Sequence, residues 1–277
     1  MAHPLGDARA KLEQARHHLR ALKAGADAIA GDPDRHCILA DYDTDEDRYV
    51  VYSKMSEDPL PNLSLGLGDL IHCARGALDF TAWQLAIKHL GREPTEDEGR
   101  QIQFPITESP DRFERSRARP YFADDVAQEV LRFQPHSPEH IRGQQLGTLQ
   151  WVSNRDKHRL VVPLVALINP PLLPEYNFES KLPRGTEVRS TFLIGPRRGA
   201  GEDEVYYCGD PTTFRLGWVE LTPRPPNTRV ELSMPAPLEV RFLGPGNALI
   251  SVDDVERIVE TVEEVVRRFE QFAPDAE

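Results

Sequence analysis

The 277-residue chain has few cysteines and no long apolar run. Its three cysteines, Cys37, Cys73 and Cys208, are odd in number, far apart and without metal-ligand spacing, which favours a reducing compartment. Nowhere do 18 apolar residues follow one another, so the sequence predicts no membrane span. The N-terminus also lacks the basic and apolar regions of a secretion signal. The sequence therefore predicts a cytoplasmic protein with no membrane partner.

The chain has fewer basic than acidic residues. The chain has 33 Lys and Arg against 45 Asp and Glu, which gives a formal net charge of −12. This balance argues against a broad electrostatic grip on nucleic acid or on an anionic membrane, although a local basic pocket stays compatible with it. The hydrophobic content of 39% and the charged content of 28% are those of an ordinary soluble protein with material for a core.

The apolar pattern changes near residue 160. Before this point it has a helical period, and after it the pattern alternates between Pro and Gly clusters, which is typical of strands. We expect strands at 161–168, 187–194, 204–208, 213–221, 228–233 and 238–242. A clean apolar stripe returns at 251–272 and predicts a closing helix.

These patterns predict a single α+β domain over residues 1–277. Residues 5–160 form mainly a helical bundle with an early β-hairpin at 36–53. An antiparallel β section at 161–248 interrupts the bundle, and the helix at 251–272 packs back on it.

A helix predicted at 64–90 carries a row of polar side chains. Ser64 is its expected N-cap, and Gly91 stands just past its end. Asp69, His72 and Asp79 share one face, and Arg75 reaches Asp79 at the i,i+4 spacing.

A second polar run follows the helix expected at 139–152. It reads Ser153-Asn154-Arg155-Asp156-Lys157-His158-Arg159 and contains no Gly or Pro. The run indicates the end of a helix whose polar side chains converge on a site. We expect it to combine with the polar face of the helix at 64–90.

These segments resemble a family of uncharacterised bacterial proteins that are common in actinobacteria. The resemblance rests on the pattern Gly68-Asp69-x-x-His72-x-x-Arg75-x-Ala-Leu-Asp79 and on Ser153-Asn154-x-Asp156-Lys157-His158-Arg159. It also includes Gln103-Phe-Pro-Ile106 and Phe133-Gln-Pro135. The family has no settled activity, so the resemblance implies a fold more than a function. Cys73, Gly76 and Phe80 depart from the residues that the family often carries.

The run at 153–159 also faintly resembles the motif of the HEPN superfamily, helical bundles that include RNA-cleaving toxins. Asn154 and His158 occupy the motif's polar and His positions, whereas Ser153 stands where the superfamily has Arg. The resemblance implies a HEPN-like bundle and an RNA-directed role in bacterial defence or toxin biology.

If the site is a metal-free ribonuclease, its chemistry needs a proton-transfer group, a cation for phosphate and a group that orients the base. His158 has the ordinary pKa for proton transfer, and Asp79 can fix its tautomer. Arg75 can hold phosphate and Asn154 can bind an oxygen. The expected substrate-binding residues are Lys157, Arg159, Arg155 and His72. No cofactor is needed, because RNA carries its own 2′-hydroxyl nucleophile.

Two alternatives remain open, and the sequence does not decide whether the protein is an enzyme. In the first, the polar run is a structural network in which Asp79 pairs with Arg159 or Lys157. The protein is then a binding or regulatory module, which pairs with a second copy or a cognate protein. In the second, a metal ion binds in the bundle between Asp69, His72, Asp79 and His158.

Overall fold

The computed structural model describes residues 4–30, 36–55, 60–137, 143–156, 163–167, 175–178, 184–192, 213–223, 230–233 and 238–274. The chain divides into two compact units, and the single α+β domain expected over residues 1–277 stays a prediction. The first unit consists of Met1–Lys23, Ser64–Val161 and Val252–Glu277, and the second of Ala24–Leu63 and Val162–Ser251. Helices and small antiparallel sheets make up the described residues, which confirms the mixed α and β class.

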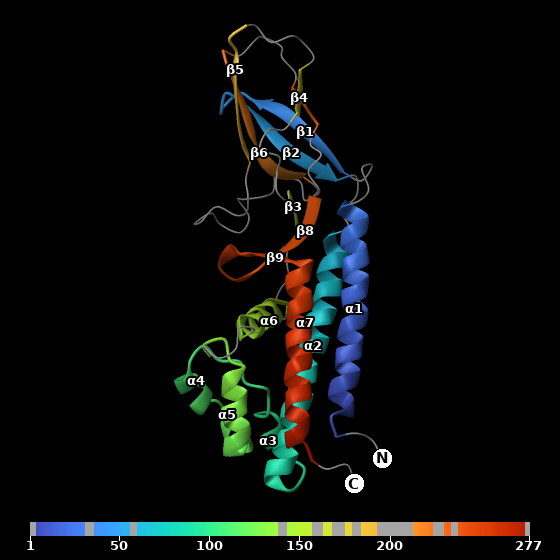
Figure 1. Cartoon of the computed structure of the whole chain (residues 1–277), viewed down its shortest axis with the longest axis vertical. Coiled ribbons are helices and arrows are strands. Elements are labelled where there is room, and N and C mark those ends of the chain that lie inside the picture. The colour runs from blue at the N-terminus through green and yellow to red at the C-terminus, as the bar shows by residue number, and fades with distance from the viewer. Residues whose placement is uncertain are drawn as a thin grey trace. The chain divides into compact units, whose positions relative to one another are not determined.

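Three long helices dominate the first unit, namely α1 (Gly6–Ala30), α2 (Leu60–Leu90) and α7 (Val252–Phe269). Figure 1 shows them as neighbours over most of their length. On α1 the buried apolar positions recur at alternating spacings of three and four, as in a coiled coil. They are Leu5, Ala8, Leu12, Ala15, Leu19 and Leu22. The buried stripe of α7 includes Val255, Val259, Val262, Val266 and Phe269, with the same alternation.

A row of ion pairs runs beside the seam between α1 and α7, and we call it the heptad ladder. Its cations lie seven residues apart along α1, and its glutamates lie seven apart along α7 in the opposite direction, so the two helices are antiparallel. The rungs are Arg9–Glu270 at 2.6 Å, Arg16–Glu263 at 2.5 Å and Lys23–Glu256 at 2.6 Å.

Helix α2 begins earlier than the sequence indicates. The expected N-cap, Ser64, lies inside the helix and is buried, because the helix already starts at Leu60. Pro61 explains the early start, since proline fits the first turn of a helix, where no N–H partner is needed. The expected end is confirmed: Gly91 has φ +64° and donates its N–H to the carbonyl of Ile87 at 2.9 Å.

Short helices connect the long ones. They are α3 (Glu96–Gly99), α4 (Pro110–Glu114), η1 (Arg119–Tyr121), α5 (Asp124–Arg132), α6 (Gly143–Asp156) and, after α7, η3 (Glu270–Phe272). The sequence Ser109-Pro110-Asp111 has the order of an N-cap followed by proline at the first helical position. This cap of α4 is confirmed, because the Ser109 hydroxyl accepts from Arg112 N. The acidic composition of residues 93–100 is typical of a linker, but the segment contains α3. Thr95 and Glu98 form a capping box at its start, which the composition does not indicate.

The second unit contains three antiparallel sheets. One has the strand order β1-β2-β6-β5, another β3-β8-β9, and the third pairs β4 with β7. The hairpin expected at 36–53 is present as β1 and β2. The strands are β1 (His36–Asp43), β2 (Arg48–Met55), β3 (Pro163–Leu167), β4 (Glu175–Phe178), β5 (Glu187–Phe192), β6 (Thr213–Thr222), β7 (Val230–Ser233), β8 (Leu238–Leu243) and β9 (Leu249–Ser251).

Most expected strands have a counterpart, but the match is incomplete. Strands β4 and β9 were not predicted, and the strand expected at 204–208 lies outside the described residues. Within the described part of the chain, no helix combines the length and the apolar character needed to cross a membrane.

Candidate functional site

The centre of the polar site is an arginine–carboxylate pair on α2. Arg75 donates to Asp79 twice, from Nε to Oδ2 at 3.3 Å and from Nη2 to Oδ1 at 2.9 Å. The spacing of four residues places both side chains on one face of the helix, as the sequence predicts. The Arg75 side chain is 13% exposed and that of Asp79 is 33% exposed, so the pair is partly shielded from water.

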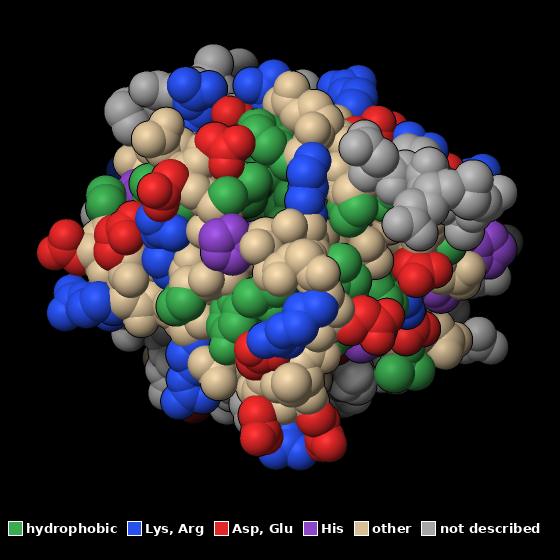
Figure 2. All heavy atoms as spheres, turned by 90° about the horizontal axis from the view of Figure 1, so that it is seen from below, with side chains coloured by type: hydrophobic (Ala, Val, Ile, Leu, Met, Phe, Trp, Pro, Cys, Tyr) green, Lys and Arg blue, Asp and Glu red, His purple; other side chains and the backbone are tan. Residues whose placement is uncertain are grey.

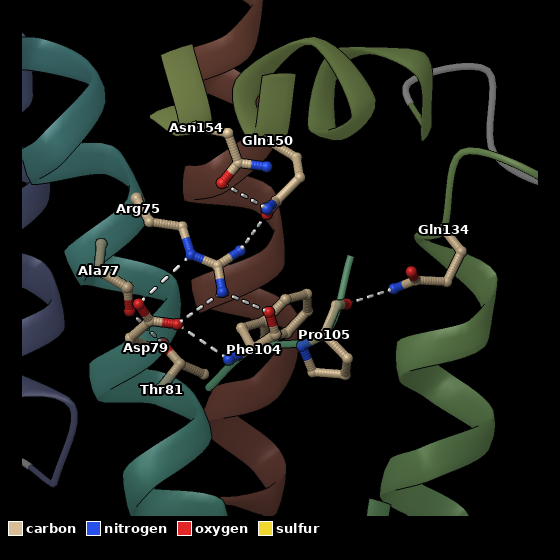
Figure 3. A network of polar contacts seen from close by, with 9 residues as sticks. All are labelled: Arg75, Ala77, Asp79, Thr81, Phe104, Pro105, Gln134, Gln150 and Asn154. Atoms are coloured by element: carbon tan, nitrogen blue, oxygen red, sulfur yellow. Dashed lines mark hydrogen bonds and ion pairs between the residues drawn. The ribbon is translucent and has the colours of Figure 1, made fainter. Parts of the chain in front are cut away.

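The pair holds an extended segment at residues 103–107 (Figure 3). Arg75 Nη2 donates to the carbonyl of Phe104 at 2.6 Å, and Asp79 Oδ1 accepts from the N–H of Phe104 at 2.9 Å. Both backbone groups of a fully buried residue are thereby satisfied by side chains of α2. The Phe104 ring packs edge-to-face against Phe269 of α7, with ring centroids 6.0 Å apart.

Gln134 completes the attachment of this segment from the other side. Its amide donates to the carbonyls of Pro105 at 2.9 Å and Val130 at 3.1 Å, while its Oε1 accepts from Thr107 N at 2.7 Å. The Gln134 side chain is fully buried, just beyond the end of α5. A buried amide without partners would cost about 1–3 kcal/mol, so these bonds stabilise the packed segment.

The network reaches α6 through Gln150. Arg75 Nη1 donates to Gln150 Oε1 at 3.1 Å, and Gln150 Nε2 donates to Asn154 Oδ1 at 3.2 Å. Asn154 itself is exposed. Figure 3 shows the chain of contacts running from Asn154 through Gln150 to Arg75. The structure thus brings together three predicted site residues, Arg75, Asp79 and Asn154.

A second polar group forms where α6 approaches α2 at Gly68. A Cβ placed on Gly68 would lie 2.6 Å from Asp156 Oδ1, so the absence of a side chain there makes room for the carboxyl group. Burial raises the pKa of the Asp156 carboxyl, the charge of Asp69 raises it further, and His72 lowers it. A carboxyl group of raised pKa beside a histidine is a candidate for proton transfer.

The remaining predicted residues differ in placement. Arg155 is buried and its guanidinium lies over the Trp151 ring, 5.4 Å from the centroid, so it faces its own helix and not an open cleft. Asp69 and His72 are exposed on α2. Lys157, His158 and Arg159 lie outside the described residues, as do any pairs of Asp79 with Lys157 or Arg159.

The metal hypothesis names Asp69, His72, Asp79 and His158. Among the residues that the structure describes, no group of three or more His, Cys, Asp or Glu side chains is placed to hold a metal ion. Asp79 is directed toward Arg75 and Phe104 N. The hypothesis involving His158 stays a prediction.

The sequence reading missed the residues that complete the network, Gln134 and Gln150. A weak signal existed for Gln134, because it stands between the apolar Phe133 and Pro135 at a helix end. Such a glutamine has few ways to satisfy its amide except through neighbouring backbone. Gln150 has no comparable signal, because only the packing of α6 against α2 brings it to Arg75.

Comparison with family models, with curated proteins and with solved structures finds no match for this chain.

Proposed function

We propose that the protein acts by binding, without catalysis, and that the network of Arg75, Asp79, Gln134 and Gln150 serves to hold its helical unit together. The proposal rests on the hydrogen bonds that the Arg75 guanidinium already makes within the protein. Its guanidinium uses Nε, Nη1 and Nη2 in four hydrogen bonds to Asp79, Gln150 and Phe104. An arginine committed in this way has little capacity left to bind a phosphate.

Asp79 supports the same proposal. In the ribonuclease hypothesis it orients the imidazole of His158. Its Oδ1 already accepts from Arg75 and Phe104, and its Oδ2 accepts from Arg75. Networks of this kind fix one packing arrangement of a core. The partner expected for such a module is a cognate protein or a second copy of the chain.

The experiment compares Arg75→Met and Asp79→Asn with the wild type in two assays, unfolding by urea and incubation with mixed single-stranded RNA. A structural network predicts lower stability in both variants and no RNA cleavage by any of the three proteins. RNA cleavage by the wild type that is lost in either variant at unchanged stability would contradict the proposal. Sedimentation velocity over a range of concentrations then separates self-association from a monomer that needs another partner.

A second candidate is a HEPN-like, metal-free role on RNA, and two observations favour it. Asn154 is exposed in the last turn of α6, and Arg155 and Asp156 separate it from the sequence Lys157-His158-Arg159. Nearby, Asp156 has a raised pKa beside His72, as proton-transfer groups often do.

This candidate is tested by RNA cleavage with wild type, Asn154→Ala and His158→Ala, each with and without EDTA. Cleavage that survives EDTA and disappears in His158→Ala supports a metal-free nuclease. Cleavage that EDTA abolishes supports the metal alternative instead. No cleavage in any sample, from proteins that are equally folded, leaves binding as the function.

A further inference from the structure

A cleft lies between α5 and the C-terminal end of α7, apart from the polar network. Its volume is about 710 Å³, within the range of about 300–1,000 Å³ that is typical of small-molecule sites. The lining residues are Glu129, Arg132, Phe133, Glu264, Arg267, Arg268, Glu270 and Gln271. Figure 2 shows the lower end of the molecule, where positive and negative side chains alternate with apolar surface.

One arginine of the cleft is fixed in place by a buried carboxylate. Arg268 Nε donates to Glu129 Oε1 at 2.6 Å, and Arg132 Nη1 donates to Glu129 Oε2 at 3.0 Å. The Glu129 side chain is only 9% exposed, and the hydrogen bond from Arg268 lowers its pKa, so it stays ionised at neutral pH. Among the described residues, Arg268 donates only through its Nε, to Glu129, so both of its Nη groups are available as donors.

A second arginine is uncommitted. Within the part of the chain that the structure describes, Arg267 makes neither a hydrogen bond nor an ion pair with another described residue, and it is exposed. Two neighbouring glutamates are engaged with α1, because Glu263 pairs with Arg16 and Glu270 with Arg9. A third, Glu264, lines the cleft together with Arg267. The lining contains three arginines and three glutamates, so its formal charges balance. The guanidinium donors that remain available to a ligand are those of Arg267 and the Nη groups of Arg268, next to the buried ring of Phe133.

We propose that this cleft binds a small organic oxyanion, a ligand with a phosphoryl or carboxylate group, through Arg267 and Arg268. Planar guanidinium groups match both kinds of oxyanion with paired hydrogen bonds. Glu129 acts as a positioning residue, since it fixes Arg268 without touching the ligand. The glutamates that also line the cleft repel an extended polyanion, which favours a small ligand over nucleic acid. This site is independent of the function proposed for the α2–α6 network.

The experiment is calorimetric titration of the full chain with inorganic phosphate and, separately, with citrate, at an ionic strength held constant with sodium chloride. Arg267→Gln removes the uncommitted donor from an exposed position, so the variant is expected to fold. Arg257→Gln is the matched control, because Arg257 is exposed on the same helix, pairs only locally with Asp254 and lies outside the cleft.

We expect wild type and Arg257→Gln to bind at least one probe equally, and Arg267→Gln to bind it about tenfold or more weakly, as for the loss of a hydrogen bond to a charged group. Binding of phosphate alone identifies a phosphoryl ligand, and binding of citrate alone identifies a carboxylate ligand. Absence of binding to either probe overturns the proposal. Equal weakening in both variants also overturns it, because the effect would then come from general ion attraction.

Discussion

The carboxylate of Asp79 accepts a hydrogen bond from the backbone N–H of Phe104 at 2.9 Å, across 25 residues of sequence. It thereby provides an extended segment with the kind of partner that a neighbouring strand would provide in a sheet. Arg75 supplies the matching donor to the Phe104 carbonyl. Two side chains of one helix thus make the backbone contacts that a neighbouring strand makes in a sheet.

Replacement of Asp79 by alanine tests this relationship. The variant leaves the Phe104 N–H and the Arg75 guanidinium without their carboxylate partner. We expect the free energy of unfolding to fall by about 2 kcal/mol. This is less than the loss for a fully buried ion pair, because Asp79 is partly exposed. Glu93→Ala is the control, since Glu93 is an exposed carboxylate just past the end of the same helix. Urea unfolding of both variants gives the comparison. Equal losses in the two would show that the Phe104 contact contributes little.

Gly68 and Gly66 provide a matched pair on α2. A Cβ at Gly66 meets only Leu22 Cδ1 at 4.0 Å, whereas one at Gly68 lies 2.6 Å from Asp156 Oδ1. We expect Gly66→Ala to stabilise the protein by up to about 1 kcal/mol, because alanine favours helix. We expect no such stabilisation from Gly68→Ala, because the new methyl group displaces the Asp156 carboxyl. Thermal unfolding measures both. The difference in stability between Gly66→Ala and Gly68→Ala should vanish when Asp156 is also replaced by alanine. If the difference persists, a contact other than that with Asp156 disfavours a side chain at position 68.

The raised pKa of Asp156 predicts a pH dependence. Its ordinary value is 3.8, and the folded-state pKa lies above this. At a pH below the ordinary pKa, the Asp156 carboxyl is protonated in both the folded and the unfolded protein. As the pH rises through the folded-state pKa, ionisation of this carboxyl lowers the stability of the folded protein. Asp156→Asn stays neutral, so its stability relative to wild type should increase as the pH rises above 3.8 and level off once the pH exceeds the folded-state pKa. Urea unfolding at several pH values measures this. A constant difference between the two proteins would contradict the raised pKa.

The heptad ladder predicts a charge-reversal effect at its middle rung. Arg16→Glu places two glutamates opposite each other, with an expected loss of about 1 kcal/mol, since both side chains are 40% exposed and screened by water. The double variant Arg16→Glu, Glu263→Arg should regain part of this, limited by Glu13 beside position 16. Arg117→Glu serves as control, because Arg117 is exposed on a segment outside α1 and α7. Chemical unfolding of these proteins and of the single variant Glu263→Arg measures the coupling between the two positions. Additive effects of the two substitutions would exclude a direct Arg16–Glu263 interaction.

Local patterns predicted much of the fold because they depend on neighbouring residues. The apolar stripe of α7, the terminal Gly91 and the cap at Ser109 are of this kind. The capping box of Thr95 and Glu98 is equally local, and the acidic composition of its segment concealed it. The start of α2 was misplaced because Ser64 has cap chemistry but lies in the buried interior of the helix.

The site could be predicted only in part, because its partners come from separate segments. The i,i+4 spacing of Arg75 and Asp79 indicates their pair, but no periodicity indicates that they contact Phe104. The burial that raises the pKa of Asp156 likewise depends on how closely α6 approaches α2. The functional hypothesis depends most on His158, which lies outside the described residues.

The pairing of α1 with α7 has a consequence for biosynthesis. Lys23 and Glu256 are 233 residues apart, and every segment of the second unit lies between them in the chain. During translation α1 therefore emerges with an exposed apolar stripe long before its partner helix exists. The second unit has all its residues by the time α7 is made. Contacts of such long sequence separation slow folding, so the helical unit should be the last part of the protein to mature and the part most dependent on chaperones.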